Sequence, residues 1–166
     1  MKLFESEQCR SIAETVLAEV TTEMSTILPT ARVEHVGSSS IPGALSKGDI
    51  DVCIIVAAGQ LPKAVSALTA RGYVEKTETL RTPQLCMLLS PRRDIDLALQ
   101  VIETGSQFEF FMSFRDALRS DPALVTRYNR VKKEALSLSD DQYRQAKSRF
   151  IEEVLLARRG TSQGGL

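Results

Sequence analysis

The 166-residue sequence contains a single histidine, His35, together with three cysteines and no tryptophan. One imidazole excludes the catalytic zinc sites that are built from several histidines, so a metal bound here is expected to have oxygen ligands. The cysteines form no CxxC pair, and their odd number argues against a disulfide framework. These absences fit a protein of a reducing compartment.

Net charge and long hydrophobic runs are also absent. Lysine plus arginine and aspartate plus glutamate each number 21, which leaves no overall field to collect nucleic acid or an acidic membrane. Residues 115–166, with 11 basic and 7 acidic side chains, are nevertheless locally positive. No apolar stretch approaches about 18 residues, and the polar start MKLFESEQCR is unlike a signal peptide. We therefore expect a cytoplasmic protein.

Hydrophobic periodicity predicts an α+β fold. Apolar residues at steps of three and four indicate a long N-terminal helix from Ser6 to Leu28 and a shorter helix over Leu61–Arg71. Apolar runs at 31–36, 49–56, 73–76, 83–90 and 93–101 predict a mixed β-sheet of four to five strands. The last two runs are separated by a short polar segment and are expected to form an antiparallel hairpin.

A set of three C-terminal helices is predicted near 106–119, 122–137 and 140–159. Each begins at a capping signal. Ser106 with Glu109, and Ser139 with Gln142, have the spacing of a capping box, and Asp121 precedes a proline at the first helical position. We expect one domain over residues 1–159 and a flexible tail over 160–166.

Two acidic residues in the second predicted strand are the main candidates for chemistry. Asp49 and Asp51 alternate with apolar residues, so their side chains should share one face, roughly 6–7 Å apart at Cα. Carboxylates held this close are usually neutralised by a divalent cation, and Mg²⁺ prefers one or two carboxylates plus phosphate oxygens. Asp96 repeats the apolar–acid–apolar pattern and is the expected third carboxylate, with Asp94 in reserve. The alternative interpretation of the acids is a solvated strand end.

A glycine- and serine-rich turn precedes these acids. Gly37 allows a ligand to approach the backbone closely, and Ser38 and Ser39 offer hydroxyl and amide groups to triphosphate oxygens. Lys47, just before the acids, is either a phosphate contact or an exposed lysine. His35 is interpreted as structural support for the turn in preference to a general base.

These motifs resemble those of known proteins. Gly-Ser, followed after about ten residues by Asp-x-Asp and then by an acid on a later strand, is similar to the DNA polymerase β-like nucleotidyltransferase superfamily. Three blocks, HVGSSSIPG, FRDALRSDPALVTRYNRVKKEAL and YRQAKSRFIEEVL, together resemble the GrpB family, also called UPF0157, from about Val33 to Leu155. The resemblance implies the nucleotidyltransferase fold and a nucleotide-handling site.

The resemblance also implies roles for individual residues. Gly37 and Ser38 take the phosphate-binding position, Asp49 and Asp51 the metal-binding position, and Asp96 that of the third acid. Lys147 matches the YxxAK block of the family and becomes a candidate triphosphate ligand.

Two departures from the family pattern bear on activity. Members commonly carry His-x-His on the strand before the FRD block, and SKP or AKP before the acids. This chain has Ala98 and Gln100 at the first place and Ser46-Lys47-Gly48 at the second.

The predicted function is a Mg²⁺-dependent nucleotidyltransferase that moves a nucleoside monophosphate from an NTP to an unidentified acceptor, expected to be a small molecule. The alternative is a nucleotide-binding or regulatory module that performs no transfer. A third interpretation, an RNA-modifying enzyme, is disfavoured by the zero net charge.

Overall fold

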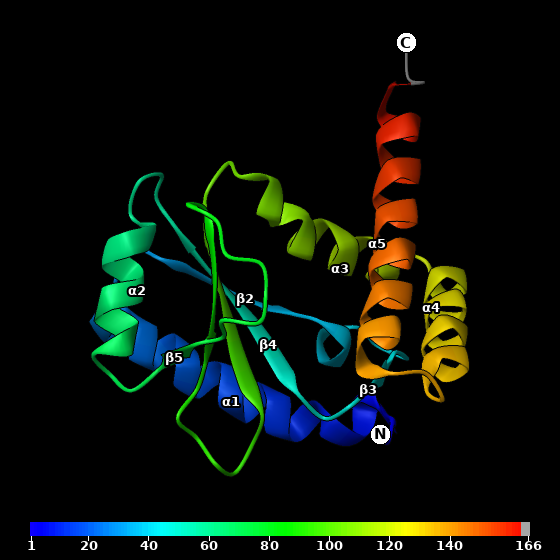
Figure 1. The fold of residues 1–166 in the computed structure, drawn as a ribbon, viewed down its shortest axis with the longest axis horizontal. Coiled ribbons are helices and arrows are strands. Elements are labelled where there is room, and N and C mark those ends of the chain that lie inside the picture. The colour runs from blue at the N-terminus through cyan, green and yellow to red at the C-terminus, as the bar shows by residue number, and fades with distance from the viewer. Residues whose placement is uncertain (164–166) are drawn as a thin grey trace.

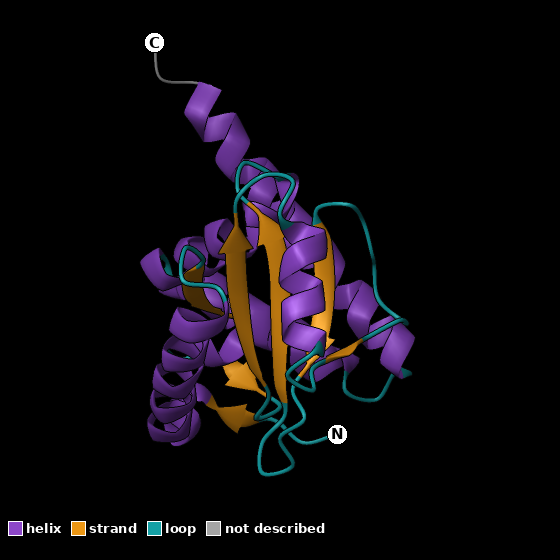
Figure 2. Ribbon diagram, turned by 90° about the vertical axis from the view of Figure 1, so that its left-hand side faces the viewer, coloured by secondary structure: helices purple, strands orange, loops and turns teal. Residues whose placement is uncertain are grey.

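A five-stranded mixed sheet lies at the centre of the computed structural model, which describes residues 1–163 (Figures 1 and 2). The helices are α1 (Ser6–Ile27), α2 (Leu61–Thr69), α3 (Phe110–Ser120), α4 (Pro122–Ala135) and α5 (Asp140–Gln163), with 3₁₀ turns η1 (Ser38–Ser40) and η2 (Gln107–Glu109). The strands are β1 (Phe4–Glu5), β2 (Arg32–Val36), β3 (Leu45–Ser46), β4 (Ile50–Val56), β5 (Val74–Glu75), β6 (Leu85–Leu89) and β7 (Leu97–Glu103). The predicted α+β class, mixed sheet and N-terminal helix are confirmed.

Strands β4 and β7 form the parallel centre of the sheet. The strand order is β2-β4-β7-β6-β5, and every pair other than β4–β7 is antiparallel. Val52 and Ile54 of β4 face one side while Cys53 and Ile55 face the other, and all four are buried. A strand covered on both faces reads as a continuous apolar run, which is why β4 was recognisable in the sequence.

Helices cover both faces of the sheet, as Figure 2 shows. Buried residues of α1 and α2, such as Val16 and Leu68, pack on the face of Val52 and Ile54. Residues around η2 and α3, such as Phe108 and Met112, pack on the opposite face. Helices α3, α4 and α5 share a separate cluster, in which the rings of Tyr128 and Phe150 stack with centroids 5.2 Å apart. The site described below lies where this helical cluster meets the sheet.

The segment before β7 differs from the prediction. Residues 93–96 were expected to begin a strand, but β7 starts at Leu97. Arg92 instead closes the connection by donating two hydrogen bonds to the Asp94 carboxylate, at 3.0 and 2.7 Å. The acids at 94 and 96 therefore lie in the turn, outside the regular sheet.

Helix ends in the C-terminal set follow the sequence signals in two of three cases. The Asp121 side chain accepts a hydrogen bond from the Ala123 amide at 2.9 Å, and Ser139 and Gln142 cap each other reciprocally. Ser106 makes no side-chain cap, because the 3₁₀ turn η2 separates it from α3. None of the helices among residues 1–163 is long and apolar enough to cross a membrane.

Helix α5 is longer than predicted and extends away from the rest of the molecule in Figure 1. The expected flexible tail at 160–166 is helical as far as Gln163, and 164–166 lie outside the described residues. Gly160 costs a helix only about 1 kcal/mol relative to alanine, and the Thr161 hydroxyl donates back to the carbonyl of Ala157 at 3.3 Å. Small residues alone therefore did not end the helix.

Asn129 of α4 fixes the loop that leads to β4. Its Oδ1 accepts from the Leu45 amide and its Nδ2 donates to the Gly43 carbonyl, both at 2.8 Å. We expect Asn129→Ala to lower the free energy of unfolding by about 1–3 kcal/mol, because two backbone groups of the loop, the partly buried Leu45 amide and the exposed Gly43 carbonyl, lose their partner. Urea unfolding measures the change.

Thr126→Ala on the same helix is the matched control. The Thr126 hydroxyl bonds only within its own helix, to the Pro122 carbonyl, and is exposed, so a change within about 0.5 kcal/mol is expected. Equal losses in the two variants would show that Asn129 does not clamp the loop.

Candidate functional site

The two acids predicted from the sequence meet at the start of β4. Asp51 is the second residue of the strand, in register with Val36 of β2 and Ala98 of β7, and Asp49 directly precedes the strand. Both side chains are partly buried. Burial, and next the charge of Asp49, raise the pKa of Asp51 to about 6, because each disfavours a second negative charge at this point. The pair is therefore under electrostatic strain that a nearby cation would relieve.

The turn after β2 packs directly on Asp51. Gly37 has φ 74° and ψ −178°, a combination that is essentially restricted to glycine. A Cβ added there would lie 2.6 Å from Asp51 Oδ2, closer than real Cβ atoms approach. Within the turn, Ser40 Oγ donates to the Gly37 carbonyl at 2.6 Å. The local sequence thus holds the backbone of the turn against the carboxylate.

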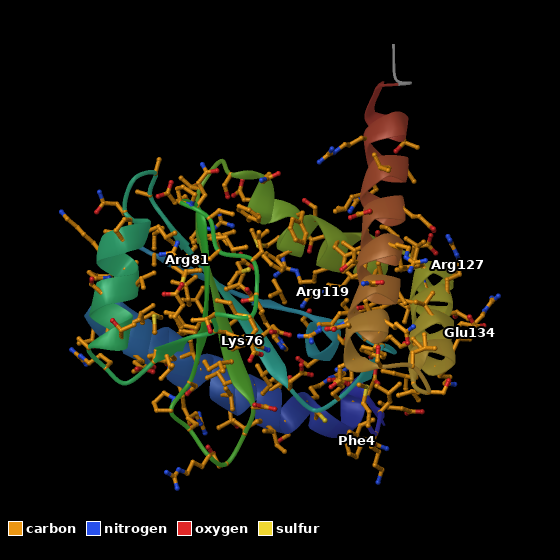
Figure 3. All side chains as sticks on the ribbon, viewed as in Figure 1. Phe4, Lys76, Arg81, Arg119, Arg127 and Glu134 are labelled. Atoms are coloured by element: carbon orange, nitrogen blue, oxygen red, sulfur yellow. The ribbon has the colours of Figure 1, made fainter. Side chains whose placement is uncertain are left out.

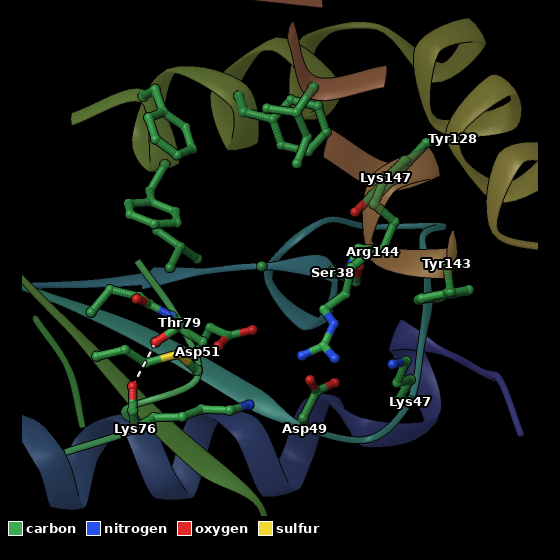
Figure 4. A pocket seen from close by; sticks show the side chains of 18 of the residues that line it. Ser38, Lys47, Asp49, Asp51, Lys76, Thr79, Tyr128, Tyr143, Arg144 and Lys147 are labelled. Carbon is green, nitrogen blue, oxygen red and sulfur yellow. Dashed lines mark hydrogen bonds between the residues drawn. The ribbon is translucent and has the colours of Figure 1, made fainter. Parts of the chain in front are cut away.

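A cavity of about 590 Å³ opens above this contact, between the sheet, α3 and α5 (Figure 4). It has a charged part that contains Asp49, Asp51 and basic residues, and an apolar part lined mainly by aromatic rings. The polar lining residues are Ser38, Lys47, Asp49, Asp51, Lys76, Glu78, Thr79, Gln100, Asp140, Arg144 and Lys147, and the rings are those of Phe110, Phe111, Phe114, Tyr128 and Tyr143. The volume is in the range of small-molecule sites.

Two lysines in the cavity share one aromatic ring. Lys47 Nζ lies 4.4 Å and Lys147 Nζ 5.6 Å from the ring centroid of Tyr143, which is buried. Burial and then the neighbouring Lys147 lower the pKa of Lys47. Burial also opposes the charge of Lys147, but the surrounding Tyr128, Tyr143, Asp51 and Asp49 outweigh it and raise its pKa. Two cations are therefore held close together beside the Gly37 turn, a suitable place for an anion.

A third lysine supports the turn from behind. Lys132 of α4 is 1% exposed, and its ammonium group donates to Ser38 Oγ at 3.1 Å and to the Leu45 carbonyl. It also lies 4.0 Å from the ring centroid of Tyr128. Burial, and then the charge of Lys147, lower its pKa to about 7. The side chain thus ties together the turn and the loop before Asp49.

Most of the predicted site residues are brought together. Gly37, Ser38, Lys47, Asp49, Asp51 and Lys147 all line the cavity. Ser39 does not, because its hydroxyl pairs with His35 Nε2 at 2.9 Å and lines another cavity with it. Burial, followed by the charges of Arg119 and Arg115, lowers the pKa of His35 to about 4. His35 therefore supports the turn from the opposite side of the sheet.

The expected third carboxylate is not brought to the other two. Asp96 is exposed and does not line the cavity, and only its carbonyl reaches β4, accepting from the Ile50 amide at 2.8 Å. The residue that faces Asp51 on β7 is Ala98, and the Gln100 side chain, which lines the cavity with Asp51, acts to lower the pKa of Asp51. Within residues 1–163 no three His, Cys, Asp or Glu side chains cluster to hold a metal. The reason is the start of β7 at Leu97, after the turn that Arg92 closes.

Sequence reasoning missed several residues of the site, notably Lys132, Lys76, Tyr128 and Arg144. Lys132 left a detectable signal, because it occupies the apolar stripe of α4 with Val125, Tyr128 and Ala135. A lysine on a buried helix face is rarely placed there without a partner. Arg144, which extends from α5 into the cavity in Figure 4, and Lys76 left no comparable signal.

The fold is nucleotidyltransferase-like. The structure is similar to that of the Cid1 poly(U) polymerase with MgGTP bound, with a TM-score of 0.59 and 18% sequence identity, over 80% of this chain and 44% of that chain. At this identity the similarity concerns the fold alone.

The chain belongs to the GrpB family, whose model, described as GrpB protein, matches residues 8–156. It is 44% identical over 155 residues to a UPF0157 protein of Vibrio cholerae, covering 93% of this chain and 82% of that protein. A UPF0157 protein of Deinococcus radiodurans is 31% identical over 130 residues, with coverages of 77% and 68%. The conserved protein GrpB from Enterococcus faecalis has a similar crystal structure, with a TM-score of 0.73, 22% identity and coverages of 95% and 99%. The family inferred from the motifs is confirmed.

Gly37→Ala tests the contact between the turn and Asp51. We expect a loss of more than about 2 kcal/mol in the free energy of unfolding, because the backbone strain of about 1–3 kcal/mol is joined by a clash with the carboxylate. Urea unfolding measures it, and the part due to the carboxylate should shrink in an Asp51→Ala background.

Gly105→Ala is the control, since Gly105 has φ 75° but no atom within 4 Å of an added Cβ. Gly105→Ala is expected to lower the free energy of unfolding only by the strain of the left-handed backbone, roughly 1–2 kcal/mol. A Gly37→Ala variant no less stable than Gly105→Ala would contradict the close packing.

Lys132→Met tests the buried ammonium group. Because the folded protein holds the pKa of Lys132 near 7 and the unfolded chain near its ordinary 10.5, the unfolded chain binds more protons between these values. The stability of the wild type should therefore rise, by at most about 1.4 kcal/mol per pH unit, as the pH increases from 7 towards 10, relative to Lys132→Met. Urea unfolding at pH 7 and at pH 9.5 measures the difference.

Lys133→Met, at the exposed neighbouring position, should keep the pH dependence of the wild type. If Lys132→Met keeps it as well, Lys132 is not the group that titrates.

Proposed function

We propose that this chain transfers a nucleoside monophosphate from a Mg²⁺-bound nucleoside triphosphate to a small-molecule acceptor, with release of pyrophosphate. The observation that supports this most directly is the contact between the Gly37 turn and Asp51. This contact holds the backbone of the turn, to which we assign the phosphates, beside Asp51, and Asp49 lines the same cavity.

The triphosphate belongs at the basic end of the cavity. Backbone amides and the hydroxyl of Ser38 are available at the turn, and Lys47 and Lys147 supply positive charge beside it. Arg144 of α5 lines the same end. Four groups from two separate parts of the chain thus meet where a polyphosphate would lie.

Asp49 and Asp51 fit Mg²⁺. Both supply carboxylate oxygens, the ligands that Mg²⁺ prefers. The like charge of Asp49 is one cause of the raised pKa of Asp51, and a divalent cation bound between the two acids would lower that pKa again. The ion, when bound, neutralises negative charge on the phosphates and activates the phosphorus for displacement. The Cid1 structures that share the fold contain MgGTP or MgATP, which supports the same ligand class here.

The chain itself contributes binding and orientation. Gln100 lines the cavity with Asp51 and favours its ionised form, and the Gly37 turn packs against the Asp51 carboxylate. Lys47 and Lys147 neutralise the pyrophosphate that departs. No side chain is assigned as general base.

A nucleotide-binding module that performs no transfer is the second candidate. It is favoured by one observation: Ala98 faces Asp51 on β7, Gln100 follows two residues later, and the predicted third acid, Asp96, does not line the cavity. Two carboxylates are sufficient to bind one ion with its triphosphate, whereas a second ion normally needs a third.

The double variant Asp49→Asn, Asp51→Asn tests the proposal. Wild-type protein should be stabilised by Mg-NTP, by roughly 2.7 kcal/mol at 100 times the dissociation constant, and should release pyrophosphate with a competent acceptor. The double variant should lose the Mg²⁺-dependent part of the stabilisation and all turnover, because the ion loses both ligands. Thermal unfolding and a pyrophosphate assay measure the two effects.

Asp96→Asn is the matched control, since it removes the same kind of charge just outside the cavity. It should behave as the wild type, and a loss of turnover in it would return Asp96 to the metal site. Turnover in the double variant equal to that of the wild type would refute the proposal. Stabilisation by Mg-NTP without pyrophosphate release, across acceptors, would favour the binding module.

A further inference from the structure

A fourth lysine, Lys76, lines the cavity on the side away from the phosphate-binding turn. The turn follows β2 at one edge of the sheet, and Lys76 directly follows β5 at the other. Figure 4 draws Asp49 between Lys76 on one side and Lys47 on the other. Figure 3 shows Lys76 over the middle of the sheet, whereas Arg127 and Glu134 lie at the outer margin on α4. Asp49 therefore lies between Lys76 and Lys47.

The position of Lys76 is set by the sheet. Its amide donates to the Met87 carbonyl at 2.9 Å, which extends the β5–β6 pairing by one residue. Met87 is in register with Gln100 of β7, and Gln100 acts on Asp51 by favouring its ionised carboxylate. All four residues line the cavity. A row of side chains thus leads across the sheet from Lys76 to the carboxylate.

Among residues 1–163, no side chain on the same side of the cavity is placed to take a proton beside the acids. Ala98 faces Asp51, Asp96 lies outside, and Gln100 is an amide. Glu78 is the other carboxylate on this side, but it is exposed and does not cluster with Asp49 and Asp51. A hydroxyl acceptor requires removal of its proton during attack on phosphorus, whereas an ionised oxygen does not.

We propose that the acceptor is a small molecule whose attacking oxygen is already ionised, a phosphate monoester or a carboxylate, and that Lys76 draws this oxyanion to the acids. The inference rests on the proposed function and names its substrate class. An oxygen–phosphorus bond forms between the acceptor and the α-phosphorus, and the bond from the α-phosphorus to the bridging oxygen breaks. The electron pair leaves on pyrophosphate, and no proton moves.

Lys76 has a physical reason to be needed on this side. An anionic acceptor entering beside Asp49 and Asp51 meets like charge, and a cation at the entrance offsets that repulsion. The positive charge of Lys76 already acts on Asp51, where it favours the ionised carboxylate. Neutral acceptors would gain nothing from this lysine.

Binding to the nucleotide-loaded protein tests the inference without knowledge of the natural acceptor. The protein is saturated with Mg²⁺ and the α,β-methylene analogue of whichever NTP gives the largest thermal shift, so that the basic end is filled. Glycerol 1-phosphate, glycerate and glycerol, three probes of similar size, are then titrated by calorimetry. We expect at least one of the two anions to bind at least tenfold more tightly than glycerol, and the stronger anion identifies the acceptor group.

Lys76→Met should weaken binding of that anion at least tenfold and leave binding of the nucleotide analogue unchanged. Lys63→Met, at an exposed position on α2, should bind both as the wild type does. Glu78→Gln should bind the anion at least as tightly, because it removes a negative charge from the same wall.

Three results would overturn the inference while the proposed function stands. In the first, the anions bind no more tightly than glycerol. In the second, Lys76→Met leaves anion binding unaffected. In the third, Lys76→Met no longer binds the nucleotide analogue, which would assign the lysine to the triphosphate. A wild-type protein that fails to bind the Mg²⁺-nucleotide analogue would instead refute the proposed function, and this inference with it.

Discussion

The packing of Gly37 against Asp51 is the constraint on which the site depends. The strand pairing of β2 with β4 brings Val36 level with Asp51, so the residue after Val36 must turn immediately above the carboxylate. Only a residue without a side chain fits, because an added Cβ would lie 2.6 Å from Asp51 Oδ2. The turn and the acid are therefore fixed relative to each other by backbone geometry, and the lysines need only surround them.

The charged side chains of the site form two clusters, one of acids and one of lysines. Burial and the neighbouring Asp49 raise the pKa of Asp51, and burial and the neighbouring Lys147 lower the pKa of Lys132. Asp51 and Lys132 are thus each less stable in the charged form than they would be in water. A ligand that combines a divalent cation with a polyphosphate supplies opposite charge to both at once. The proposed ligand would thus account for the several charged side chains that a protein with no net charge keeps partly buried at one place.

The sequence was informative where one residue type or spacing had a single physical explanation. The apolar run of β4, the long α1 and the Gly-Ser to Asp-x-Asp spacing each predicted what the structure contains. The two-residue strands β1 and β3 are too short to give a period. The sequence pattern around Asp96 was misleading for another reason. Alternation predicts the face that a residue occupies only if the residue lies in a strand. Arg92 and Asp94 close a turn here, and β7 begins only at Leu97. Contacts between side chains distant in sequence, such as Lys132 with Ser38, have no local pattern.

Because β7 begins only at Leu97, binding of a nucleotide and deprotonation of an acceptor would depend on different parts of the fold. The proposed nucleotide binding would depend on β2, β4 and the helices α4 and α5, none of which is altered by the register of the segment before Leu97. A side chain that deprotonates an acceptor would have to come from β7, but the residue of β7 that faces Asp51 is Ala98. The phosphate side of the cavity can therefore keep its geometry while the acceptor side changes. An acceptor that brings its own charged oxygen removes the need for the missing acid, and a cation on the far edge of the sheet then becomes the feature that selects it.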